Sequence, residues 1–365
     1  MPYFCTPMSK GFYKLKVQKV VQETADANTF YFHIPENLKE AFAYSAGQYL
    51  TFETDINGEK VRRSYSLCTY QPADEFPAVT VKRVEGGKMS NFMNDNLHEG
   101  AEIDVMAPNG KFTLIPEAGR SNRYVLFAGG SGITPMMGIA KAALLHELGS
   151  SVVLVYANRN PESVIFKNAI NQMEQAYPGR FKVLHSYDKA PLTWFGLKGL
   201  FTEEKVLNLL NSKLEGAAAS AHFYICGPGP MMDVVKKSLA AAGVESNRVH
   251  TEYFSAPVSS EPKPAEQPTE TAFNGQAQVK VSVYGKTHSI SCDDKTTILN
   301  ACMKNGIDPP YSCTVGVCTT CRAKVHKGNL YMMEREGLTD DEIAEGFVLT
   351  CQALPRSSDI ELTYE

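Results

Sequence analysis

The chain has 365 residues, which is too long for one ordinary hydrophobic core and predicts two or three domains. Its apolar fraction of 43% and charged fraction of 21% are typical of globular proteins, and a net charge of −4 argues against nucleic acid as a partner. No apolar run is long enough for a membrane span, and the N-terminus lacks the pattern of a signal peptide. We therefore expect a cytoplasmic protein, not bound to a membrane, whose nine cysteines are free, catalytic or metal-bound.

Residues 8–115 contain short runs in which apolar and polar residues alternate, as they do in strands. Examples are residues 47–53 and 78–84, and Asn57-Gly58 between them is a strong hairpin signal. Several short strands joined by turns predict a small antiparallel β-barrel.

The sequence RRSYSL, residues 62–67, lies on one of these predicted strands. Alternation along the strand puts Arg63 and Tyr65 on one face, and Ser66 follows. Such side chains can bind a phosphate, stack on a flat ring and hydrogen-bond its edge. An ordinary exposed strand face carries the same residue types and is the alternative.

The sequence GGKMSNFMND, residues 86–95, predicts a glycine turn that leads into a helix with Ser90 in its first turn. The free N–H groups at a helix N-terminus favour a bound phosphate. A turn before an amphipathic helix explains the same pattern without a ligand.

Strand-like and helix-like segments alternate over residues 121–254. This alternation predicts an α/β domain with a parallel sheet and helices on both faces. The predicted strands cover residues 123–130, 151–157, 181–186 and 222–227, and the predicted helices cover residues 135–148, 162–175 and 230–243.

Two glycine turns in this region follow predicted parallel strands. The first is FAGGSGITPMM, residues 127–137, with Pro135 expected at the first position of a helix, and the second is YICGPGPMM, residues 224–232. Open α/β sheets bind ligands at the carboxyl ends of their strands, so both turns are candidates for a nucleotide site. Packing explains the glycines equally well, and a buried core thiol is the alternative for Cys226.

The predicted strand over residues 151–157 ends in the sequence YANRNPES, which has Arg159 and no acid directly at the strand end. An acid there would favour NAD through its ribose hydroxyls, whereas an arginine pairs with the 2′-phosphate of NADP. Arg159 therefore favours NADPH, and a solvated loop residue is the alternative.

Residues 255–276 contain four prolines and few large apolar residues, which predicts an extended, mobile linker. It leads to a C-terminal domain over residues 277–365. This domain has a predicted hairpin over residues 279–292 and a predicted helix within residues 293–306, with an aspartate cap and Gly306 as its stop.

Three cysteines of this domain, Cys313, Cys318 and Cys321, have the spacing C-x4-C-x2-C, and Cys351 follows. Plant-type [2Fe-2S] ferredoxins show this spacing, and their four thiolates hold two irons. A structural zinc site with four cysteine ligands is the alternative, although such sites usually show two short cysteine pairs.

Residues 277–365 resemble a plant-type ferredoxin domain, including LTDDEIAEGFVLTC ahead of the last cysteine. The resemblance implies an α+β β-grasp fold. The family often has an arginine after its first cysteine, where this chain has Thr314. Cys292 and Cys302 fit no ligand position, so we expect them to be core thiols.

The motifs R-x-Y-S and G-x-x-S, about twenty residues apart, resemble the ferredoxin-NADP reductase superfamily. In that family the arginine contacts the flavin phosphates, the tyrosine packs on the isoalloxazine, and the serine and glycine hold the pyrophosphate. The resemblance implies FAD, with FMN as the alternative that some relatives use. The implied flavin-binding residues are Arg63, Tyr65, Ser66, Leu67, Gly87, Met89 and Ser90.

The two glycine turns also match this superfamily, whose G-G-x-G-I-T-P and C-G-P motifs hold the nicotinamide cofactor. The family ends this domain with a carboxylate two residues before an aromatic that shields the flavin, and Glu252 and Phe254 match in HTEYF. A surface acid and a packed phenylalanine are the alternative. The implied nucleotide-binding residues are Gly129, Gly130, Gly132, Thr134, Pro135, Cys226, Gly227 and Pro228, and the implied catalytic residues are Glu252, Cys226 and Thr134.

Over nearly its whole length the chain resembles the reductase components of bacterial multicomponent oxygenases, and among them the phenylacetyl-CoA epoxidase reductase type. The resemblance implies that NAD(P)H reduces the flavin, that the cluster takes electrons singly, and that they pass to a partner oxygenase. Two other functions stay open: a redox sensor or regulator, and a flavin reductase with a zinc-binding tail.

Overall fold

The computed structural model describes residues 11–254, 273 and 275–364. The chain forms two compact units, one over Tyr13–Phe254 and one that contains Ser255–Glu365, and each is described by itself. Apart from residues 273, 275 and 276, the predicted linker over residues 255–276 lies outside the described part of the chain.

The first part of the larger unit is an antiparallel β-barrel. Its sheet has the strand order β4-β3-β6-β1-β2-β5, and a bridge between Leu67 and Val79 joins the two ends of that order. Buried apolar side chains such as Phe30, Leu50 and Phe52 fill its interior, so the predicted barrel is confirmed. Its elements are β1 (Phe12–Thr24), β2 (Ala27–His33), η1 (Glu36–Leu38), β3 (Tyr49–Ile56), β4 (Glu59–Ser66), β5 (Ala78–Lys82), α1 (Lys88–Asn96) and β6 (Glu102–Met106).

The predicted hairpin joins β3 to β4 through Asn57 and Gly58. Both residues have positive φ angles, 56° and 79°, which is the conformation that a two-residue type I′ turn requires. The Asp55 carboxylate accepts the Gly58 N–H at 2.8 Å and closes the turn. This turn fixes the register that pairs Tyr65 with Leu50 and Arg63 with Phe52.

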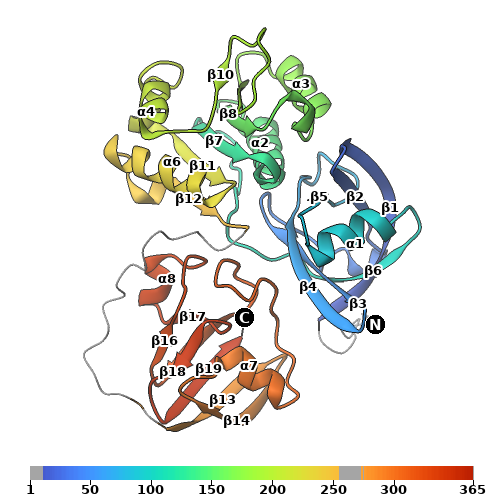
Figure 1. Ribbon diagram of the computed structural model, residues 1–365, viewed down its shortest axis with the longest axis vertical. Coiled ribbons are helices and arrows are strands. Elements are labelled where there is room, and N and C mark those ends of the chain that lie inside the picture. Colours follow the sequence, from blue (N-terminus) through green and yellow to red (C-terminus); the bar gives the residue numbers. More distant parts are fainter. Residues whose placement is uncertain (1–10, 255–272, 274, 365) are drawn as a thin grey trace. The chain divides into compact units, whose positions relative to one another are not determined.

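The second part of the larger unit is a six-stranded sheet in the order β10-β9-β8-β7-β11-β12, in which every neighbouring pair is parallel. Figure 1 shows α2 and α3 on one side of this sheet and α4 and α6 on the other, as predicted for an α/β domain. Its elements are β7 (Arg123–Gly129), η2 (Gly130–Gly132), α2 (Ile133–His146), β8 (Ser151–Asn158), η3 (Pro161–Ser163), α3 (Lys167–Ala176), β9 (Phe181–Tyr187), β10 (Leu197–Lys198), α4 (Glu203–Asn211), α5 (Ala217–Ser220), β11 (His222–Cys226), α6 (Gly229–Ala241), η4 (Ser246–Arg248) and β12 (Val249–Glu252).

Two helix starts differ from the predictions. Helix α2 begins at Ile133, so Pro135 is its third residue rather than its first. A proline is tolerated there because the first turn of a helix has no internal partner for its N–H groups. Helix α3 begins at Lys167 instead of residue 162, because Phe166 has a left-handed φ of 61° and its N–H donates to Glu23 of the barrel at 3.2 Å.

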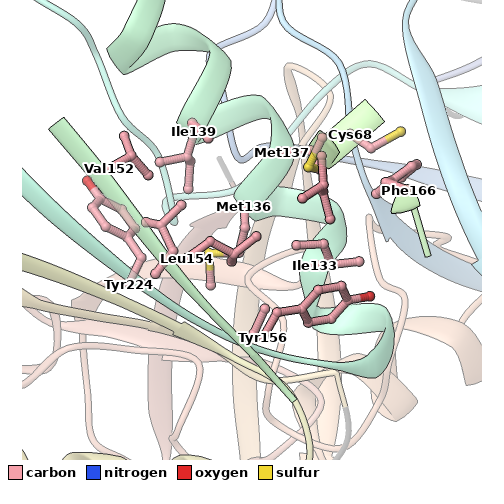
Figure 2. Close-up of a cluster of buried hydrophobic side chains, with 14 of the residues drawn as sticks. Cys68, Ile133, Met136, Met137, Ile139, Val152, Leu154, Tyr156, Phe166 and Tyr224 are labelled. Carbon is pink, nitrogen blue, oxygen red and sulfur yellow. The ribbon is translucent and has the colours of Figure 1, made fainter. Parts of the chain in front are cut away.

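The barrel and the parallel sheet share one buried core. Figure 2 shows Cys68 of the barrel in the same cluster as Met137 of α2 and Phe166. At Gly138 of α2, a Cβ atom would lie only 2.9 Å from the carbonyl oxygen of Thr69. A methyl group there would overpack the contact, so the glycine lets the helix approach the barrel backbone closely.

The described part of the smaller unit is an α+β domain. Its main sheet has the order β14-β13-β19-β15-β17, with β13 and β19 parallel, and α7 packs against β14 and β18. The five-stranded mixed sheet with one packed helix agrees with the expected β-grasp fold. Its elements are β13 (Gln276–Val283), β14 (Lys286–Asp293), α7 (Ile298–Lys304), β15 (Arg322–Lys327), β16 (Leu330–Met332), α8 (Asp340–Ala344), β17 (Phe347–Leu349), β18 (Ala353–Pro355) and β19 (Asp359–Tyr364).

The predicted aspartate cap of α7 is wrong. The cap is Thr297, whose hydroxyl accepts the Asn300 N–H at 3.3 Å. Asp293 is too far from the first turn and instead accepts the Thr296 N–H at 2.6 Å in a turn of its own. Gly306, with a φ of 73°, follows the helix as predicted.

Candidate functional site

The two predicted glycine turns lie at the same edge of the parallel sheet. Strands β7 and β11 are neighbours, and Cys226 pairs with Ala128 at their carboxyl ends. After β7 the chain continues to β8 on one side, whereas after β11 it continues to β12 on the other. The carboxyl ends of these two strands are therefore a topological switch point, where open α/β sheets form their ligand crevice.

Three of the glycines in these turns allow close packing. A Cβ atom at Gly132 would lie 2.1 Å from the Cys226 carbonyl oxygen, and one at Gly129 would lie 2.6 Å from Pro228 Cδ. A Cβ atom at Gly227 would lie 2.9 Å from the Gly129 backbone nitrogen. Close packing therefore requires glycine at these three positions, and it also brings the two turns together.

Gly130 differs from the other three glycines. Its φ is +52°, and no atom lies within 4 Å of the position that a Cβ would take. The space beside this residue is open, so a ligand can approach its backbone closely. The Gly130 carbonyl accepts the buried hydroxyl of Tyr156 at 3.1 Å, which holds the turn in place.

Sequence reasoning missed Tyr156. In the sequence it is one apolar position of a buried strand, and only the fold shows that its hydroxyl reaches the turn after β7. Thr134, a predicted catalytic residue, is buried and its hydroxyl donates to the Ser131 carbonyl at 3.0 Å, within the same turn. Both contacts stabilise the turn.

Ser66 of the barrel and Glu252 of the nucleotide domain meet although they are 186 residues apart. The Ser66 hydroxyl donates to Glu252 Oε2 at 2.9 Å. Strand pairing puts Glu252 directly beside Cys226, whose side chain is fully buried. The structure thus brings together three residues that the sequence analysis proposed separately.

The electrostatics of this group follow from its burial. Burial raises the pKa of the Glu252 carboxyl to about 8, and the Ser66 hydrogen bond opposes the shift only in part. Burial also raises the pKa of the Cys226 thiol well above its usual value, and the Glu252 charge adds to that shift. Cys226 is therefore a neutral thiol at neutral pH. Phe254, two residues after Glu252, is 44% exposed.

The predicted flavin face of β4 shows the expected alternation. Arg63 is exposed and Tyr65 is half-buried, whereas the neighbouring Arg62 is fully buried and pairs with Glu53 at 2.5 Å. Arg62 therefore has a structural partner, and the Arg63 guanidinium lies at the surface. Leu67, also predicted to contact the flavin, is fully buried beside Val79.

The N-terminus of α1 has the close-packed turn expected of an anion site. Gly87 caps the helix, and a Cβ atom there would lie 2.5 Å from Ser90 Oγ. The Ser90 hydroxyl accepts the Val84 N–H at 3.2 Å and keeps its own proton for donation. Met89, the other predicted residue, is buried below this turn. Gly87 and Ser90 therefore shape the turn and leave the amides of the first turn for an anion.

Arg159 directly follows β8 and is exposed. Its carbonyl accepts the Lys189 N–H at 2.8 Å, which links it to the loop after β9. Within the described residues its guanidinium forms no ion pair. It lies at the carboxyl edge of the sheet, on the β8 side of the switch point.

The four predicted metal-binding cysteines approach one another as two pairs. Cys318 hydrogen-bonds the Cys313 sulfur and lowers the pKa of Cys313 to about 5, and the Cys313 sulfur also accepts the Val315 and Cys318 N–H groups. Cys321 and Cys351 form the second pair, in which the neighbouring Cys351 thiol and burial raise the pKa of Cys321 well above its usual value. Among the residues that the structure describes, no three potential ligands converge as a single-ion site. Two thiol pairs suit a cluster of two irons held by four thiolates.

The loop between these cysteines follows a tight path. Thr314 has a φ of 59° and Gly316 a φ of 78°. A Cβ atom at Gly316 would lie 2.8 Å from Glu334, so only glycine fits there. The Gln352 side chain donates to the Thr314 carbonyl at 2.9 Å and ties the loop to the residue after Cys351. Cys292 and Cys302 lie in the domain's hydrophobic core.

These features define an oxidoreductase with a flavin barrel, a nucleotide-binding α/β domain and a ferredoxin-type domain, and family models agree. They match residues 14–114 to "Oxidoreductase FAD-binding domain", residues 126–237 to "Oxidoreductase NAD-binding domain" and residues 281–356 to "2Fe-2S iron-sulfur cluster binding domain".

The similarity to known proteins covers nearly the whole chain. One of the subunits of the 1,2-phenylacetyl-CoA epoxidase of Escherichia coli is 36% identical over 97% of this chain and 98% of its own length. "3-ketosteroid-9-alpha-monooxygenase, ferredoxin reductase component" of Rhodococcus rhodochrous is 36% identical over 96% of both chains. The solved structure of phthalate dioxygenase reductase matches 98% of this chain and 100% of its own with a TM-score of 0.58 at 25% identity.

The chain belongs to the family of ferredoxin-type reductase components of oxygenase systems. It is an NAD(P)H-dependent oxidoreductase that passes electrons through FAD to a [2Fe-2S] cluster and on to an oxygenase or similar acceptor. The sensor and zinc-tail alternatives are not favoured. In the described part of the chain no helix has the length and apolar character that crossing a membrane requires.

Proposed function

We propose that this reductase supplies electrons to an oxygenase of the phenylacetyl-CoA epoxidase type. The observation that carries the proposal is the match to the Escherichia coli protein, which extends over 98% of that relative. The ketosteroid monooxygenase reductases reach the same identity of 36%, so the acceptor has to be tested directly. Eight free cysteines in the described residues suit the reducing cytoplasm, which we propose as the location.

Reconstitution tests the acceptor. The purified reductase is combined with the oxygenase subunits of an epoxidase or with a ketosteroid oxygenase, and oxygenated product is measured with NADH or NADPH. We expect product only with the epoxidase. Product only with the ketosteroid oxygenase would overturn the assignment while leaving the electron-transfer function intact.

We propose that Arg63 and the α1 N-terminus bind the FAD phosphates and that Tyr65 packs on its ring. Arg63 is exposed on the predicted face, and the first-turn amides of α1 form a second anion site. Two anion sites fit the two phosphates of FAD, whereas FMN has a single phosphate. The bound flavin supplies the redox chemistry; the protein orients it. Chromatography of the released cofactor distinguishes FAD from FMN.

We propose that the nicotinamide binds at the switch point, over the turns that contain Gly130 and Gly227. Ser66, Glu252 and Cys226 then line the place where nicotinamide and flavin meet, and the neutral thiol can contact the ring without adding charge. Arg159 lies further along the same edge, where the ribose end of the nucleotide would reach. A 2′-phosphate would pair with its guanidinium, so we propose NADPH as the preferred donor.

The acceptor docks, in our proposal, on the surface beside the cluster loop. The Gly337 N–H donates to the Gly316 carbonyl at 2.9 Å, so the first part of residues 334–345 packs against that loop. This segment contains six acidic residues and one arginine. Val315 and Met333 are 40% and 51% exposed beside it. An apolar centre with an acidic rim favours a partner that presents a basic rim.

Truncation separates the two halves of the proposed path. A chain that ends after Ser260 retains every proposed flavin and nicotinamide residue, and we expect it to reduce ferricyanide with NAD(P)H at the full-length rate. We expect it to give no oxygenase turnover, because the cluster domain is missing. Full oxygenase turnover by the truncated chain would show that electrons bypass the cluster.

A further inference from the structure

Two buried hydroxyl groups lie behind the proposed cluster ligands. The side chains of Thr350 and Tyr364 are 0% and 7% exposed. The Tyr364 hydroxyl donates to Thr350 Oγ1 at 2.9 Å, and Thr350 Oγ1 donates to the Cys321 carbonyl at 2.9 Å. Thr350 lies in the stretch LTDDEIAEGFVLTC and Tyr364 lies outside every quoted motif, and neither belongs to the proposed ligand set.

The direction of these hydrogen bonds determines what Thr350 can do. A threonine hydroxyl has one proton, and because Tyr364 donates to its oxygen, that proton is free to point at Cys321. The Thr350 N–H donates to the same carbonyl at 3.2 Å. The residue that precedes Cys351 thus makes two hydrogen bonds to the Cys321 carbonyl, which ties the backbone segments of the two cysteines together.

Tyr364 has a fixed position of its own. It is the last residue of β19, where it pairs with Ala323 of β15, and β19 also pairs with β13 in the middle of the sheet. Its hydroxyl has a second neighbour in the buried Cys302 thiol of α7. The phenol therefore links the rigid centre of the domain to the loop that carries the cysteines.

We infer that Tyr364 is a positioning residue for the [2Fe-2S] cluster, acting through the Thr350 hydroxyl. By directing that hydroxyl at the Cys321 carbonyl, it would hold Cys321 and Cys351 in position as ligands of the cluster. This inference rests on the proposed ligand set. The orientation of ligands, and the hydrogen bonds around them, affect how firmly a metal centre is held and its reduction potential.

Single hydroxyl deletions in the full-length protein test the inference. The variants are Tyr364→Phe, Thr350→Val, Thr350→Ser and the double variant Tyr364→Phe with Thr350→Val. Tyr331→Phe is the matched control, because Tyr331 lies in the same domain with its ring under Arg356. The measurements are the rate of cluster release to a chelator, the reduction potential, and the electron paramagnetic resonance spectrum of the reduced cluster.

We expect Tyr364→Phe and Thr350→Val to release the cluster roughly tenfold faster, the scale of one lost buried hydrogen bond, and to shift the potential and the spectrum. Thr350→Ser should behave as the wild type, and the double variant should equal Thr350→Val alone, because the phenol acts through the threonine. A Tyr364→Phe protein that matches Tyr331→Phe in all three measurements would overturn the inference, and so would additive effects in the double variant.

Failure of the ligand set is distinguishable from failure of this inference. If Cys321→Ser retains a full cluster, the proposed ligands are wrong and Tyr364 has no pair to position. If Cys321→Ser loses the cluster while Tyr364→Phe keeps wild-type release, potential and spectrum, only the positioning role fails.

Discussion

In the ferredoxin domain three of the four proposed ligands lie within the nine residues 313–321, whereas in the larger unit Ser66 and Glu252 meet across 186 residues. The cluster loop depends on local conformations, such as the left-handed Thr314 and Gly316. The flavin and nicotinamide site depends instead on the packing of two domains, through contacts such as Gly138 against Thr69. A substitution in one site should therefore leave the cofactor of the other site in place. The predictions below run from loss of a whole cofactor to a small change in the rate of electron transfer.

The largest effect is expected for Cys321→Ser. It removes one of four thiolates, and we expect loss of most of the iron and of the cluster absorbance, with flavin content unchanged. Iron analysis and visible spectra measure both. Cys292→Ser is the matched control, because that thiol is buried in the core of the same domain and should leave the cluster in place. Full iron content in Cys321→Ser would remove this residue from the ligand set.

The converse change is Arg63→Ala together with Ser90→Ala. Both residues belong to the proposed phosphate sites, so we expect most of the flavin to dissociate during purification while the cluster colour remains. Lys60→Ala on the same strand is the control, since Lys60 pairs with Glu53 at the surface. Undiminished flavin occupancy in the double variant would contradict the placement of the phosphates.

Glu252→Gln should slow flavin reduction roughly tenfold or more with little change in nucleotide affinity, because the amide oxygen can still accept the Ser66 hydroxyl but the amide cannot gain or lose a proton. Stopped-flow measurements separate the two quantities. An unchanged reduction rate would leave Glu252 as a structural residue only.

The same variant has a defined pH signature. The folded protein holds the Glu252 proton more tightly than the unfolded chain, with a pKa of about 8 against 4.5. This contribution to stability is complete below about pH 4.5 and is lost as the pH rises through about 8. In flavin-free protein, Glu252→Gln should therefore make the free energy of unfolding fall less between about pH 4.5 and 8 than it does in the wild type.

Arg159→Ala should weaken NADPH more than NADH. A lost charge-assisted hydrogen bond costs roughly 1.5 to 3 kcal/mol, which is about tenfold or more in affinity. Inhibition by NADP and NAD gives both affinities. Equal losses for the two nucleotides would remove the reason for preferring NADPH.

The smallest effect is expected for Asp340→Asn with Asp341→Asn. Both side chains are exposed in the acidic segment over residues 334–345, and exposed charges act mainly on the association rate. We expect a few-fold slower transfer to the oxygenase at low salt, and a weaker decline of that transfer with rising salt than in the wild type. Ferricyanide reduction should not change. If the transfer rates of the variant and the wild type fell equally with rising salt, the acceptor would bind at another surface.

Patterns with a local physical cause were predicted well from the sequence. The turn at Asn57-Gly58 needs two positive φ angles, which few other residue pairs adopt. The alternation of strands and helices after residue 121 permits little other than a parallel sheet. Helix starts were less predictable, because the N–H of Phe166 is bonded by Glu23, a residue far away in the chain.

The barrel, the α/β domain and the cysteine spacing could be predicted from the sequence alone, because periodicity and turn chemistry are local properties. The β-grasp fold and the roles of the site residues were implied by resemblance to known families. The folded protein was needed to show that Ser66, Cys226 and Glu252 meet, that Tyr156 holds the turn at Gly130, and that Tyr364 reaches Thr350. These contacts join strands distant in the chain. Hydrogen-bond partners at such a distance are set by sheet order and packing, which no short stretch of sequence encodes.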